Sequence, residues 1–147
     1  MNDPTMNSHK RILVVEDDPM VAALLTDVLT LHGHPVDTVS DGLLALQKIH
    51  ERPYDLIMSD MRMPGLDGPG LYRELARHRP ELISRFLFVS GTTHDAENRR
   101  FLEETRAPCL AKPFDIRHLH DVTERMLRAA DGTPEPLSLA DAPSRPR

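Results

Sequence analysis

Five residues at the ends of short apolar runs have side chains suited to phosphoryl or metal chemistry: Glu16, Asp17, Asp60, Ser90 and Lys112. Two carboxylates about 4 Å apart repel one another by ~4 kcal/mol at an effective dielectric constant of ~20, so a carboxylate cluster requires a cation or a shared proton. Oxygen ligands suit Mg²⁺, which binds few carboxylates together with water and phosphate. A carboxylate beside that ion can act as the nucleophile toward a phosphoryl group, while a lysine neutralises charge.

Each of these residues, taken alone, also has an ordinary structural explanation. Glu16 and Asp17 stand where acidic side chains favour the start of a helix, and Asp60 precedes a loop in which aspartate stabilises turns. Ser90 fits loop chemistry, and a lysine such as Lys112 is usually solvated. Their coincidence favours a site, because all of them would end strands that meet at one edge of a single sheet.

Apolar runs alternate with amphipathic segments along the chain, which predicts an α/β fold of five tandem βα units. The expected strands are 12–15, 35–39, 56–58, 86–89 and 109–111. The expected helices run from 19 to near 33, from 42 past 49, around 71–75 and ending before 80, over 95–104, and over 116–126, with a loop at 64–68. Such an alternation implies a parallel sheet with right-handed crossovers and helices on both faces.

The first and last expected helices have apolar faces. These faces consist of Val21, Leu24, Leu25 and Val28 in the first helix and of Ile116, Leu119, Val122 and Met126 in the last. The first set has the i, i+3, i+4, i+7 spacing of an amphipathic helix, and we expect both sets to face the sheet.

The composition is that of an ordinary globular protein, with 39% apolar and 28% charged residues. No apolar run is long enough to cross a bilayer, and residues 1–10 do not resemble a signal peptide. The net charge of −5 and the lack of tryptophan argue against direct nucleic-acid binding. A single cysteine excludes an internal disulfide and fits a cytoplasmic location. We expect a disordered lead-in over 1–9, one domain over 10–130 and a proline-rich flexible tail over 131–147.

Four segments, KRILVVEDDPMV, DLIMSDMRMPGLDG, FVSG and LAKPF, occur in this order at suitable spacing. Together they resemble the receiver domain of bacterial response regulators, either stand-alone or like those of hybrid kinases. The resemblance covers about residues 10–130. It implies a doubly wound, flavodoxin-like sheet of five parallel strands in the order 2-1-3-4-5, which periodicity alone leaves open. It also implies a phosphoacceptor signalling domain that catalyses only its own phosphorylation and dephosphorylation, rather than an enzyme.

The resemblance gives the acidic residues specific roles. Asp60 would accept a phosphoryl group from a histidine kinase or a histidine phosphotransfer protein. Glu16, Asp17, Asp60 and the backbone carbonyl of Arg62 would hold Mg²⁺, with Asp17 as a more direct ligand than Glu16. Arg62 stands two residues after the acceptor, where its long cationic side chain could alter the access of water.

The remaining site positions come from the later strands. By the resemblance, Ser90 would hydrogen-bond a phosphoryl oxygen and Lys112 would form a charge-assisted contact to it. Pro113 follows in a peptide bond that is often cis in this family. Cys109 stands where receivers commonly have an aromatic residue that turns inward on activation. A thiol side chain is too small for that role, and a buried strand position is the ordinary explanation for it.

The expected function is that of a single-domain response regulator that signals or relays phosphate through protein–protein contacts, because residues 131–147 are too few for an effector module. Its downstream protein is unknown, and a second copy of the chain is a candidate partner; nucleic acid and membrane are not. One alternative is a phosphorylation-independent pseudo-receiver adaptor, which would usually lack Asp60 or Lys112. A remote one is a Mg²⁺-dependent phosphohydrolase with an aspartate nucleophile, which would need a D-x-D pattern on the first strand. A flavin site is disfavoured because the acids after that strand would repel its phosphate.

Overall fold

The protein is described by a computed structural model that covers residues 10–91 and 95–130. The lead-in over 1–9 and the tail over 131–147 that the sequence predicts lie outside the described residues. Within the described residues, no helix is both long enough and apolar enough to span a membrane.

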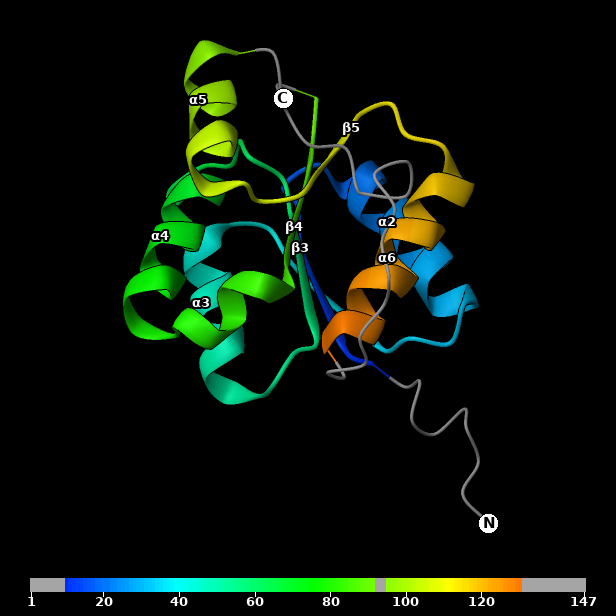
Figure 1. Cartoon of the computed structure of the whole chain (residues 1–147). Helices are drawn as coiled ribbons and strands as arrows, with labels where there is room; N and C mark the ends of the chain where they lie inside the picture. The colour runs from blue at the N-terminus through cyan, green and yellow to red at the C-terminus, as the bar shows by residue number, and fades with distance from the viewer. Residues whose placement is uncertain (1–9, 92–94, 131–147) are drawn as a thin grey trace.

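Five parallel strands form one sheet in the order β2-β1-β3-β4-β5 (Figure 1). The strands are β1 Ile12–Val15, β2 Val36–Val39, β3 Leu56–Ser59, β4 Phe86–Ser90 and β5 Cys109–Ala111. This order confirms the doubly wound, flavodoxin-like fold. In the register of the central strands, Val15 pairs with Val39 of β2 and with Ser59 of β3, so the residues after these strands meet at one edge.

Helices cover both faces of the sheet (Figure 1). Their bounds are α2 Pro19–Leu31, α3 Gly42–Glu51, α4 Gly68–His78, α5 Ala96–Thr105 and α6 Ile116–Ala130, with a 3₁₀-helix η1 over Pro80–Arg85. Alternate residues of β1 point to opposite faces: Leu13 and Val15 pack in a core with α3, α4 and α5, and Ile12 and Val14 in a core with α2 and α6. The two cores explain why the central strands are apolar throughout.

All five α-helices of the described residues begin after an aspartate at the same edge of the sheet. The side chains of Asp18, Asp41, Asp67, Asp95 and Asp115 accept hydrogen bonds from the backbone amides of Met20, Leu44, Gly70, Glu97 and Arg117, respectively. Each cap satisfies an amide that has no partner inside its helix. The helix starts therefore add further carboxylates to the edge at which the strands end.

The structure corrects the predicted helix faces at two positions. Leu24 is 43% exposed, because α2 packs on the sheet through Leu25, Val28 and Leu29, and Leu24 lies about 100° around the helix from Leu25. Ile116, the first residue of α6, is 48% exposed, and the rest of its apolar face packs in the core. Two further differences concern element bounds. The helix α4 begins at Gly68, which the sequence predicts to lie in a loop, and the 3₁₀-helix η1 is not predicted.

Candidate functional site

The three carboxylates predicted at the strand ends come together. One oxygen from each of Glu16, Asp17 and Asp60 lies within 4.8 Å of the others. The backbone explains this arrangement, because the Asp60 amide donates to the Val15 carbonyl at 3.0 Å and so continues the ladder of β1 and β3. Glu16 is 3% exposed and Asp17 is exposed, so the cluster extends from the protein interior to its surface.

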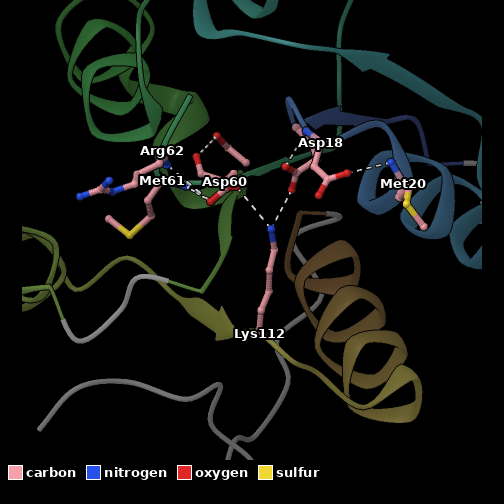
Figure 2. A network of polar contacts seen from close by, with 8 residues as sticks. Asp18, Met20, Asp60, Met61, Arg62 and Lys112 are labelled. Carbon is pink, nitrogen blue, oxygen red and sulfur yellow. Dashed lines mark hydrogen bonds and ion pairs between the residues drawn. The ribbon is translucent and has the colours of Figure 1, made fainter. Parts of the chain in front are cut away.

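Lys112 lies among these carboxylates. Its Nζ is 3.0 Å from Glu16 Oε1 and 3.3 Å from Asp60 Oδ2. Figure 2 shows the lysine pointing from the end of β5 toward Asp60. Its position follows from backbone pairing, since the Lys112 amide donates to the Ser90 carbonyl at 2.9 Å and extends the ladder between β4 and β5.

Burial disfavours the charged form of both Lys112 and Glu16, but the neighbouring groups outweigh it only at the lysine. Burial opposes the charge of Lys112, but hydrogen bonding to Glu16 and the charges of Asp60 and Glu16 outweigh it and raise the lysine pKa. Burial raises the pKa of Glu16, although hydrogen bonds from Lys112 and from the Asp18 amide act to lower it. The ammonium therefore stays charged at neutral pH and offsets part of the repulsion among the carboxylates.

Asp60 is held in place by its own loop. Its Oδ1 accepts from the Met61 amide at 2.7 Å and from the Arg62 amide at 3.4 Å, while Oδ2 faces Lys112. Gly68 packs directly behind it, because a Cβ at that residue would lie 2.3 Å from the Asp60 carbonyl oxygen. Oδ1 is thus held by the backbone, and Oδ2 lies beside a cation.

A cavity of about 400 Å³ opens beside the carboxylates. Its lining residues come from the ends of β1 and β3 and the starts of α4 and α5: Asp17, Met61, Arg62, Met63, Pro64, Asp67, Asp95, Glu97 and Asn98. Across this group, Arg62 Nη2 lies 3.1 Å from Asp95 Oδ2. This ion pair is not predictable from the spacing of Arg62 and Asp95 in the sequence. One sequence feature points toward the pairing: Asp95 is an aspartate at the start of the helix that follows β4, so it lies at the same edge of the sheet as Arg62.

The other predicted positions lie along β4 and β5. Ser90 is fully buried at the end of β4, and the pairing of Ser59 with Phe88 puts it at the same edge of the sheet as Asp60. Cys109 is 6% exposed, and burial, together with the charge of Asp60, raises its thiol pKa to about 12. The peptide bond between Lys112 and Pro113 is cis.

Residues 12–124 match the family model of the response regulator receiver domain. The chain belongs to this family. It is 34% identical over 121 residues to the response regulator receiver protein CpdR of Brucella abortus, covering 82% of this chain and 99% of that protein. It is also 34% identical over 128 residues to the sensor kinase CckA of the same organism, covering 86% of this chain but only 13% of the kinase.

A solved structure with the same fold is the receiver domain of a sensor histidine kinase from Pseudomonas aeruginosa, with a magnesium ion coordinated in its active-site cleft. It is 27% identical, with a TM-score of 0.72, and the match covers 80% of this chain and 97% of that one. The protein is therefore a receiver domain of two-component signal transduction. Receiver domains interact with histidine kinases or phosphotransfer proteins, and the family is one of signalling domains.

Proposed function

We propose that Asp60 accepts a phosphoryl group from a phosphohistidine of a histidine kinase or a histidine phosphotransfer protein, in a reaction that depends on Mg²⁺. The observation that carries this proposal is the convergence of Asp60 with Glu16, Asp17 and Lys112 at one edge of the sheet. Membership of the receiver family supports it independently.

In the proposed transfer, a carboxylate oxygen of Asp60 attacks phosphorus. A phosphorus–oxygen bond forms as the phosphorus–nitrogen bond to the donor imidazole breaks, and the imidazole leaves with the electron pair and takes up a proton. The Met61 amide, which already donates to Oδ1, keeps the carboxylate oriented during attack. Lys112, now 3.3 Å from Oδ2, pairs with phosphoryl oxygens in the product. We assign to Ser90 a hydrogen bond to a further phosphoryl oxygen.

The donor set fits Mg²⁺, because it consists of carboxylate oxygens within 4.8 Å of one another. Glu16, Asp17, Asp60 and the backbone carbonyl of Arg62 would hold the ion. When bound, it would neutralise charge on the carboxylates and on the phosphoryl oxygens. The positive charge of the ion is needed, because the single ammonium of Lys112 beside three carboxylates leaves the site negative before the phosphoryl group arrives.

We propose that the phosphodonor binds at the start of α2. The Asp18 amide donates to Glu16 Oε2 at 3.1 Å and its side chain accepts from the Met20 amide, so Asp18 links the start of α2 to the carboxylate cluster. Met20 is 81% exposed, and Leu24 one turn later is 43% exposed. These side chains offer an apolar contact at the start of the helix that follows Glu16 and Asp17. The face formed by α5, β5 and α6 is our candidate for the downstream partner or a second copy of the chain, and a cytoplasmic location is part of the same proposal.

The test is intact mass spectrometry after incubation with acetyl phosphate and Mg²⁺. We expect the native chain to gain one phosphoryl group, and we expect no gain with EDTA or with Asp60→Asn. A folded native chain that gains no mass would refute phosphotransfer and favour the pseudo-receiver adaptor. Asp37→Asn serves as the matched control and should gain the phosphoryl group, since Asp37 contacts Tyr54 and two arginines and is not one of the three clustered carboxylates.

A further inference from the structure

One ion pair links the acceptor loop to the first turn of α5. Arg62 lies two residues after Asp60, and its Nη2 is 3.1 Å from Asp95 Oδ2. Asp95 is the N-cap of α5, and its other oxygen accepts from the Glu97 amide at 3.0 Å. The Glu97 amide, followed by Arg62, lowers the pKa of Asp95, so this carboxylate is charged at neutral pH. A change at Arg62 can therefore reach α5 through a single side chain.

The Arg62–Asp95 pair lies on a strongly acidic surface. Arg62 is the only cation among the described residues that line the cavity beside the carboxylates, whereas four lining residues are acidic: Asp17, Asp67, Asp95 and Glu97. The Arg62 side chain is 69% exposed, and exposed ion pairs are weak. Phosphorylation would replace the singly charged carboxylate of Asp60 by a doubly charged acyl phosphate beside this acidic cavity, two residues before the only cation among its described lining residues.

The position of Arg62 allows it to contact either group. Its backbone amide is already 3.4 Å from Asp60 Oδ1, whereas Figure 2 shows its guanidinium group pointing away from Asp60. A guanidinium binds phosphate oxygens through two parallel hydrogen bonds, which makes phosphate a stronger partner than one oxygen of an exposed carboxylate. Exchange of one anion for the other would therefore turn the Arg62 side chain from Asp95 toward Asp60.

We propose that Arg62 is a positioning residue that leaves Asp95 for the phosphoryl group, so that phosphorylation of Asp60 releases the first turn of α5. This inference rests on the proposed function. It supplies a route from the site to α5 that does not use Cys109, a small buried side chain at the position where the resemblance to receivers implies an aromatic residue. Asp95 keeps its hydrogen bond to the Glu97 amide after release, so α5 loses its tie to the acceptor loop but keeps its cap.

Hydrogen exchange of the amides of α5, followed by mass spectrometry, tests the inference. The variants are Arg62→Gln and Asp95→Asn, because asparagine caps a helix about as well as aspartate but cannot form the ion pair. Arg79→Gln is the control, since it removes an exposed pair, Arg79–Glu81 at 2.7 Å, that does not line the cavity. Each protein is measured before and after treatment with acetyl phosphate and Mg²⁺, and the intact mass of each sample reports phosphorylation.

We expect phosphorylation to speed exchange in α5 at least threefold in the native chain and in the Arg79 variant. The Arg62 and Asp95 variants should exchange fast before phosphorylation and change little after it. Full phosphorylation with unchanged α5 exchange, or the same increase in all four proteins, would overturn the role of Arg62 and leave the proposed function intact. No mass gain in the native chain would overturn the proposed function and this inference together.

Discussion

The clustering of carboxylates predicts that Asp60→Asn stabilises the metal-free protein, although it removes the proposed acceptor. Asp60 lies within 4.8 Å of two other carboxylates and has one cation, Lys112, at 3.3 Å. The substituted amide oxygen can still accept from the Met61 amide, so the hydrogen bond that orients the side chain is kept. Asp37→Asn is a matched control with the opposite environment, because Asp37 accepts from the Tyr54 hydroxyl at 2.6 Å and lies 3.5 and 3.8 Å from Arg52 and Arg11.

The distances set the size of the effect. At an effective dielectric constant of ~20, a like charge at 4.8 Å costs about 3.5 kcal/mol and the ammonium at 3.3 Å returns about 5 kcal/mol. Repulsion from the two other carboxylates minus attraction to Lys112 leaves the Asp60 charge with a net cost of about 2 kcal/mol. Solvent screening at the exposed Asp17 reduces this cost to about 1–2 kcal/mol. For a domain of this size, we expect Asp60→Asn to raise Tm by roughly 3–8 °C. Asp37→Asn should lose about 1–2 kcal/mol, since it weakens a hydrogen bond to a charged group.

The assay is thermal and urea unfolding at neutral pH in EDTA, repeated with a series of Mg²⁺ concentrations. Mg²⁺ should stabilise the native chain progressively and Asp60→Asn much less, so the gap between them narrows as the ion replaces the missing positive charge. An Asp60→Asn protein that is no more stable than the native chain in EDTA would refute the electrostatic reasoning. The same shift in sign and size for Asp37→Asn would refute it as well.

Three further predictions concern Lys112, Cys109 and Gly68. The pKa of Lys112 is raised above its ordinary 10.5, so the stability that its charge contributes is complete below that pH and is lost as the pH rises through the folded value. In urea unfolding, the difference in unfolding free energy between the native chain and Lys112→Met should therefore shrink above pH 10.5. A difference that stays constant with pH would contradict this. A thiol pKa of about 12 leaves Cys109 with roughly a thousandfold less thiolate at pH 8 than a free thiol. Ellman's reagent should therefore react with the folded protein far more slowly than with the protein unfolded in urea. Rates for the two states that lie within tenfold of one another would be inconsistent with burial of the thiol. Gly68→Ala should cost about 1–3 kcal/mol in urea unfolding, because its Cβ would lie 2.3 Å from the Asp60 carbonyl oxygen, whereas an unchanged midpoint would mean that the loop moves freely.

The meeting of the strand-end residues could be predicted because it depends on the backbone alone. In a parallel sheet, every strand ends at the same edge, so the residues after β1, β3 and β5 lie at one edge whatever their side-chain types and rotamers are. The order of the strands came from the resemblance, because periodicity shows that strands exist but not which of them are neighbours. The proximity of Glu16, Asp60 and Lys112 in the structure follows from this backbone arrangement.

Contacts between side chains of different elements could not be predicted in this way. The ion pair between Arg62 and Asp95 depends on the rotamer of an arginine and on where α5 begins relative to the loop after β3. His34 shows the same limit: it is 3% exposed, and its Nε2 lies 2.6 Å from Glu124 Oε2, 90 residues later in the chain. Helical periodicity puts Leu24 on the apolar face but does not predict how much of that face the sheet covers, and Leu24 is 43% exposed.

Locating the phosphoryl group chemically tests the central claim most directly. The protein is treated with acetyl phosphate and Mg²⁺ and then with borohydride, which reduces the acyl phosphate of an aspartate to homoserine, and its peptides are sequenced by mass spectrometry. We expect homoserine at position 60 and at no other acidic position of the native chain. Homoserine at position 17, or its absence from a folded chain that has been exposed to the phosphodonor, would contradict the assignment of Asp60 as the acceptor.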